Sequence, residues 1–120
     1  MSKPKFEKKY ECLAEARLRD FGVPARKARL LCDLIRGKSV AEAINILTFT
    51  HKPSAGPAVL KLLKSARANA SVVESDPDAL RVSAAFADGA LMLKRMRPAP
   101  MGRGVRVRKR TCHITIRLDY

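Results

Sequence analysis

Two stretches of alternating apolar residues flank a long basic segment, and this pattern limits the fold more than any other feature. The first stretch covers residues 80–86 and the second covers residues 111–118. A period of two residues is typical of strands that bury one face. No Asp or Glu occurs from residue 89 to residue 118. The alternating apolar positions are Leu80, Val82, Ala84 and Phe86, and then Cys112, Ile114, Ile116 and Leu118.

The basic segment 89–110 is predicted to form a β-hairpin, the finger, that projects from the body of the protein. Arms of about ten residues each would extend about 33 Å at the rise of a strand. Two strands alone are marginally stable in water, and like charges repel along them. We therefore expect the finger to be mobile in the free protein and ordered when phosphates surround it. Its basic residues are Lys94, Arg95, Arg97, Arg103, Arg106, Arg108, Lys109 and Arg110.

The tip of the predicted finger combines proline, glycine and arginine. Proline limits the entropy lost on ordering, and glycine lets the backbone approach a ligand closely. Arginine binds phosphate through two donors and stacks on unpaired bases, which favours folded RNA as the ligand. An exposed basic loop without a partner is the alternative, although a charge run of this length is usually an interaction element. The tip residues are Arg97, Pro98, Ala99, Pro100, Met101, Gly102, Arg103 and Gly104.

The chain before residue 80 is predicted to contain three helices. Pro24 suits the first turn of the first helix, and Gly37 is placed to end it in a left-handed conformation. Ser39 and Glu42 form a capping box that opens the second helix. A third helix is expected to continue to about Val73. The predicted buried residues are Ala28, Leu31, Cys32 and Ile35, then Val40, Ala43, Ile44 and Leu47, and then Val59, Leu62, Leu63, Ala66 and Ala70.

Together these elements predict an α+β fold, with three helices packed on a small antiparallel sheet and a long protruding basic β-hairpin. Residues 11–20 alternate as a strand would, but they fit a helix almost as well. The length of 120 residues suits a single domain. Within it we expect a flexible basic N-terminus at 1–10, a globular body at 11–88 and 111–118, and the finger at 89–110.

The charge balance indicates a polyanionic partner. The chain has 25 Lys and Arg against 11 Asp and Glu, which gives a formal net charge of +14. Each phosphate contact releases condensed counterions, so such a surface binds nucleic acid. No apolar run approaches the roughly 20 residues that span a bilayer, and no signal-peptide pattern is found. We therefore expect no membrane partner and a cytoplasmic location, with an organelle left open. Because no apolar seam is left over, we expect no homo-oligomer.

Catalytic and metal sites are not expected. Cys12, Cys32 and Cys112 are scattered and lack the close pairing that structural zinc requires. His113 follows Cys112 on a predicted strand, so the two side chains point to opposite faces and cannot act as a base and its nucleophile. We therefore predict no enzyme activity, no metal and no cofactor. His113 is assigned to the outer face as a candidate RNA contact.

Basic residues also gather around the first helix. For each one alone, a solvated surface position is as good an interpretation as a phosphate contact. Together with the finger, they favour a continuous phosphate-facing surface. Lys61, Lys64 and Arg67 on the third helix are assigned to solvent instead. The first-helix candidates are Arg26, Lys27, Arg29, Arg36 and Lys38.

Three groups of residues carry a resemblance to a known family. They lie at 24–30 with 33–38, at 62–66 with 68–70, and at 93–95, 98, 102–103 and 109–115. The pattern resembles the universal large-subunit ribosomal protein number twenty-two family, in its bacterial-type form, from about Glu11 to Leu118. Ala99 departs from that family, where the position is often basic, and Arg97 is a candidate to supply the charge. Cys112 stands where Ser is common.

This resemblance implies a structural constituent of the large ribosomal subunit without catalytic activity. The body would lie near the peptide exit, bind large-subunit (23S-type) ribosomal RNA beside neighbouring large-subunit proteins, and join early in assembly. The finger would thread through the RNA. Its tip would form part of the exit tunnel wall, close to the nascent peptide.

An architectural DNA-binding protein is the alternative that the residues alone support. Such proteins insert basic β-ribbon arms with proline at the tip into the minor groove. An arm of this kind usually belongs to a dimer, for which this sequence offers no apolar seam. Competition between duplex DNA and structured RNA would discriminate between the two functions.

Overall fold

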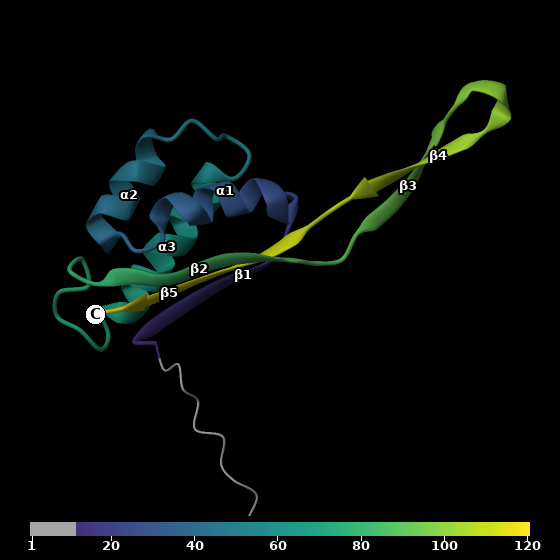
Figure 1. The fold of residues 1–120 in the computed structure, drawn as a ribbon. Coiled ribbons are helices and arrows are strands. Elements are labelled where there is room, and N and C mark those ends of the chain that lie inside the picture. The colour runs from purple at the N-terminus through teal and green to yellow at the C-terminus, as the bar shows by residue number, and fades with distance from the viewer. Residues whose placement is uncertain (1–11) are drawn as a thin grey trace, which may run out of the picture.

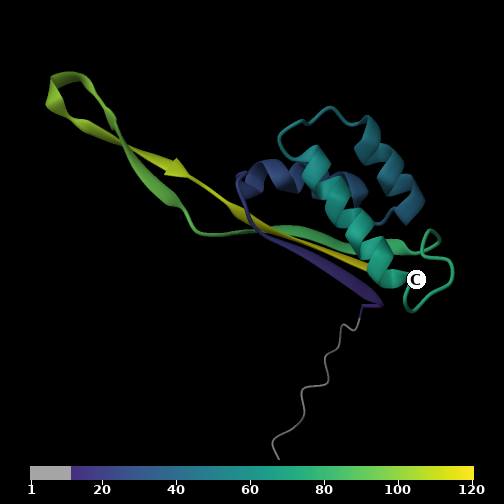
Figure 2. The same ribbon diagram turned by 180° about the vertical axis from the view of Figure 1, so that it is seen from behind.

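The computed structural model describes residues 12–120, so the predicted flexible N-terminus at 1–10 lies outside the described residues. The three helices lie together on one face of a three-stranded sheet, and a two-stranded ribbon projects away from this body (Figures 1 and 2). The predicted α+β fold is therefore confirmed. The elements are β1 (Ala14–Phe21), α1 (Ala25–Ile35), α2 (Val40–Phe49), α3 (Gly56–Ala70), β2 (Arg81–Gly89), β3 (Leu93–Pro98), β4 (Gly104–Lys109) and β5 (Cys112–Asp119).

The sheet of the body is antiparallel, with the strand order β1-β5-β2. β5 occupies the centre, where Ile116 pairs with Ala16 on one side and Ala85 on the other. The segment that fitted a strand and a helix almost equally is the strand β1. Pairing with β5 decides between them, because it satisfies the backbone groups of β1 and buries Ala14 and Ala16 under α3.

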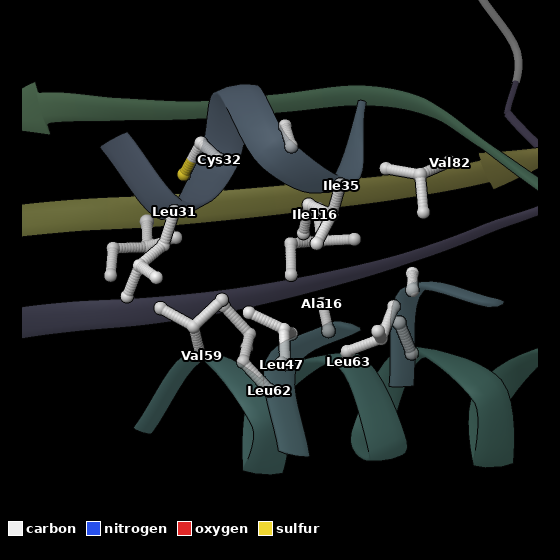
Figure 3. Packing of buried hydrophobic residues seen from close by; sticks show 14 of the residues in the cluster. Ala16, Leu31, Cys32, Ile35, Leu47, Val59, Leu62, Leu63, Val82 and Ile116 are labelled. Carbon is white, nitrogen blue, oxygen red and sulfur yellow. The ribbon is translucent and has the colours of Figure 1, made fainter. Parts of the chain in front are cut away.

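The core lies between the helices and the inner face of the sheet (Figure 3). Leu31 and Ile35 of α1 and Leu63 of α3 converge on Ile116 of β5, and each of these side chains is at most 1% exposed. Burying such a side chain contributes about 1.5–3 kcal/mol. The predicted inward residues of all three helices are buried, except that Ile44 is only partly so.

The ends of the first two helices follow local signals in the sequence. Pro24 immediately precedes α1, and Gly37 follows it with a φ of +79°. The Ser39 hydroxyl accepts a hydrogen bond from the Glu42 amide at 3.3 Å, which caps α2 as predicted. The Glu42 carboxylate lies 3.4 Å from Lys38 Nζ, so it pairs with that lysine rather than completing the reciprocal capping box.

The third helix is shorter than predicted. It ends at Ala70, whose carbonyl accepts hydrogen bonds from the Val73 and Glu74 amides in the following turn. Val73 therefore lies outside the helix, and Val72 is 85% exposed. The turn redirects the chain towards β2, which the apolar pattern of α3 could not reveal.

The predicted inward face of β2 is wrong after Val82. A bulge between Val82 and Ala84 shifts the pairing by one residue, so Ala85 and Ala87 are buried instead of Ala84 and Phe86. The Phe86 ring lies on the open face of the sheet, with its centroid 5.7 Å from the Arg117 guanidinium carbon. The cause is a tertiary contact, because Val82 exchanges hydrogen bonds with Gly37 and Lys38 between α1 and α2. The extra residue that the bulge adds to β2 turns every later side chain to the opposite face of the sheet.

Candidate nucleic-acid interface

The predicted finger is the ribbon formed by β3 and β4. The two strands pair from Leu93↔Lys109 to Pro98↔Gly104. At the base of the ribbon, the Ala90 amide donates to the Thr111 carbonyl at 3.0 Å, and the Thr111 hydroxyl donates to the Leu91 carbonyl at 2.6 Å. The paired part of each arm is six residues long, or about 20 Å, because residues 90–92 and 110–111 lie between the body sheet and the ribbon.

The two faces of the finger differ in charge arrangement. Residues paired directly across antiparallel strands project from the same face. On one face Lys94 is paired with Arg108, and the next pair is Met96 with Arg106. On the other face every cation is paired with an apolar residue. These mixed pairs are Leu93↔Lys109, Arg95↔Val107 and Arg97↔Val105.

The tip reverses direction through a tight turn at Pro100–Gly102 that is not helical at Met101. Met101 and Gly102 both have a positive φ, and the Ala99 amide donates to the Arg103 carbonyl at 2.8 Å. Gly104 lies so close to the Met96 side chain that a Cβ there would displace it. The Met101 side chain is 95% exposed, so the tip presents an apolar group between cations.

The basic residues around α1 divide into two groups. Arg29 Nε donates to the Ala87 carbonyl at 3.0 Å, and Arg36 donates to the Ala85 carbonyl at 2.6 Å and to Asp33 at 2.9 Å. These two side chains therefore fasten α1 to β2, which the sequence did not reveal. Arg26 and Lys27 are exposed. The predicted cluster is not gathered at one place: it extends from Arg26 beside Gly89 to Lys38 beside Val82, and part of its charge stabilises the fold.

His113 lies on the outer face of β5, as predicted. Its Nδ1 accepts a hydrogen bond from the Asp20 amide at 3.0 Å, so it supports the irregular end of β1, where Asp20 has a φ of +53°. Arg17 and Arg19 line the same hollow as His113, and sequence reasoning did not include them in the interface. The alternation of these two arginines with Ala16 and Leu18 along β1 is the pattern that would have placed them on the outer face.

The open face of the sheet is partly neutralised. Glu15 pairs with Arg17, and Arg117 Nε lies 3.0 Å from the Glu15 carboxylate. Hydrogen bonding from Arg17, assisted by Arg117, lowers the pKa of the Glu15 carboxyl and outweighs its partial burial. This face therefore offers less unopposed positive charge than the finger.

The buried thiols are not activated as nucleophiles. Burial raises the pKa of the Cys32 thiol to about 11, and burial also raises the pKa of the Cys112 thiol. Both side chains are fully buried and would remain thiols at neutral pH. Within residues 12–120, no cluster of His, Cys, Asp or Glu is arranged to hold a metal ion. Over the same residues, no helix has the length and apolar character needed to cross a membrane.

Comparison with known families agrees with this geometry. The family model described as ribosomal protein L22p/L17e matches residues 16–119. The match includes the three helices, the central strand and the entire finger. The chain therefore belongs to the ribosomal protein L22p/L17e family, a family of structural proteins of the large ribosomal subunit.

Proposed function

We propose that this protein binds large-subunit ribosomal RNA through its finger and the adjacent end of α1, and that it thereby aids subunit assembly. The single observation that carries this proposal is the Lys94↔Arg108 pair within a ribbon that has no acidic residue. Directly opposed like charges destabilise a strand pair. Phosphates beside the pair would offset this repulsion, so the ribbon is built for polyanionic surroundings.

Charge on both faces of the finger favours folded RNA as the partner. The ribbon projects from the body, with cations on each face and no helix covering either one (Figure 1). A duplex lying against the ribbon would place phosphates beside only one of its two faces. Enclosure by RNA segments would provide phosphates to both faces, and the apolar side chains beside the cations could pack against bases and sugars.

The tip is proposed to form part of the wall of the peptide exit tunnel. A turn at Pro98–Gly104 ends the ribbon, and its exposed Met101 offers a small apolar contact for a passing peptide. The proposed partners are ribosomal RNA, neighbouring large-subunit proteins and, at the tip, the nascent peptide, in cytoplasmic ribosomes. The residues proposed to contact RNA in the finger are Lys94, Arg95, Arg97, Arg103, Arg106, Arg108, Lys109 and Arg110.

Sedimentation of a cell lysate on a sucrose gradient, before and after a high-salt wash, tests the proposal. We expect the chain to remain in the large-subunit peak through the wash, because burial in RNA resists salt better than surface charge does. A Lys94→Gln/Arg108→Gln variant should assemble less completely than a Lys61→Gln/Lys64→Gln variant, which loses the same charge from α3. Release of the parent chain into soluble or chromosomal fractions would contradict the proposal and favour the DNA-binding alternative.

A further inference from the structure

A cleft lies where the finger leaves the body. It is formed by the first turn of α1 on one side and by the two chain segments at the base of the finger on the other, and its volume is about 270 Å³. Figures 1 and 2 show the N-terminal end of α1 beside this junction. Its lining includes Arg26 and Arg29 from α1 and Arg110 and Thr111 from the segment between β4 and β5.

The lining is cationic and has no opposing acid. Three arginines contribute to it, and none of its lining residues within the described chain is a carboxylate. Arg29 is held in place by its hydrogen bond to the Ala87 carbonyl, so its charge is fixed at the cleft before any ligand binds. Gathering Arg26 and Arg110 beside a fixed third cation is unfavourable unless an anion joins them.

The first turn of α1 adds to this positive potential. Its N-cap residue, Pro24, has no side-chain cap, and its first turn has no acidic residue. α2 differs in both respects, because Ser39 caps it and Glu42 lies in its first turn. The positive end of the α1 dipole therefore remains unopposed by the chain at the cleft.

We propose that this cleft binds one phosphate of the RNA backbone, with Arg26 and Arg110 as its principal ligands and Arg29 as a fixed third cation. The inference rests on the proposed RNA-binding function and deepens it. A phosphate held between α1 and the base of the finger would fix the direction of the finger relative to the body. Arginine forks suit phosphate, and the finger that starts at this cleft supplies further contacts along the same backbone.

The test is a salt series of binding between the full-length protein and a large-subunit ribosomal RNA transcript. The variants are Arg26→Gln, Arg110→Gln and the double variant, and the charge-matched control is Lys61→Gln/Lys64→Gln on α3. Arg29 is left unchanged because it also fastens α1 to β2. Circular dichroism and thermal unfolding of each variant establish that the fold is retained.

We expect the double variant to bind about tenfold more weakly than the control, and the slope of log affinity against log salt to fall by about 1, the value for one phosphate. The losses of binding free energy in the two single variants should not add up to the loss in the double variant, because both arginines would share that phosphate. Additive effects with a total slope change of about 2 would mean that the two arginines bind separate phosphates, and would overturn the proposal of one shared phosphate. A double variant indistinguishable from the control would overturn the inference as well.

Three further outcomes show whether the cleft inference or the proposed function has failed. If Lys94→Gln/Arg108→Gln also leaves RNA binding unchanged, the proposed function itself fails. If the finger variant weakens binding and the cleft variants do not, only the cleft inference fails. Should the cleft variants bind the transcript normally but be displaced from assembled subunits, the occupant is an acidic protein segment and the phosphate proposal is wrong.

Discussion

Lys94 and Arg108 lie directly opposite each other in the finger, on the same face of the β3–β4 pair. Lys109, by contrast, lies opposite the apolar Leu93. The repulsion within the free finger is therefore concentrated at one cross-strand pair, although the whole ribbon is basic. This arrangement makes the stability of the free finger and its affinity for phosphate respond in opposite directions to the same substitution.

Replacing Arg108 with Thr should order the free finger and weaken its binding to RNA. The substitution removes a like-charge pair worth a few tenths of a kcal/mol to about 1 kcal/mol, and Thr favours a strand. Amide hydrogen exchange at low salt should show greater protection in β3 and β4, while the salt slope of RNA binding falls by about 1. Lys109→Thr is the matched control, since it removes the same charge from a pair without repulsion. Equal gains in protection for both variants would contradict the argument.

The bulge in β2 predicts that one substitution destabilises the protein to very different extents at two adjacent positions. Ala85→Asp would bury a carboxylate in the core, where Ala85 is 1% exposed, and should destabilise the protein by about 3 kcal/mol or more. Ala84→Asp should cost less than about 1 kcal/mol, because Ala84 pairs with Arg117 on the open face. Urea unfolding measures both. The reverse order would mean that the strand continues without the bulge.

The Glu15 cluster should make stability depend on pH in acid. Its arginine partners lower the pKa of Glu15 below its ordinary value of 4.5, so the folded state favours the charged carboxylate. The resulting stabilisation is present above the unfolded pKa and is lost as the pH falls through the lower, folded pKa. The difference in unfolding free energy between the parent and Glu15→Gln should therefore be largest near neutral pH and shrink below about pH 4.5. A difference that stays constant down to pH 3 would rule out this ion pair as a stabilising contact.

The cysteines should differ in reactivity towards a thiol reagent. Cys32 and Cys112 are fully buried, whereas Cys12 is only partly buried. With a pKa of about 11, roughly one thousandth of Cys32 is thiolate at pH 8. Titration of the folded protein at pH 8 should therefore modify one thiol promptly and two more only after unfolding. Cys112→Ser should leave RNA binding unchanged. Prompt modification of Cys112 would indicate that the core opens at the base of the finger.

Local rules determine much of this fold. The helical stripe around Leu31, the ending of α1 near Gly37, the cap at Ser39 and the alternation from Cys112 to Leu118 all depend on neighbours within a few residues. The finger also follows from the sequence, because an acid-free basic segment between two half-buried strands cannot be placed in a core. These features are encoded by spacing and charge.

Features that depend on partners far away along the chain could not be predicted from the sequence. β1 is a strand because β5 pairs with it, and Phe86 faces outwards because the chain after α1 bonds to Val82 and creates a bulge. Arg29 and Arg36 bind carbonyls of β2 that lie 58 and 49 positions away along the chain, which no local pattern records. The cleft at the base of the finger likewise joins α1 to Arg110. Spacing and composition along the chain indicate the three helices, the strands β2 and β5 and the position of the charge. The tertiary structure decided which of those charges fasten the fold and which remain for a partner, because backbone carbonyls compete with phosphate for the same arginines.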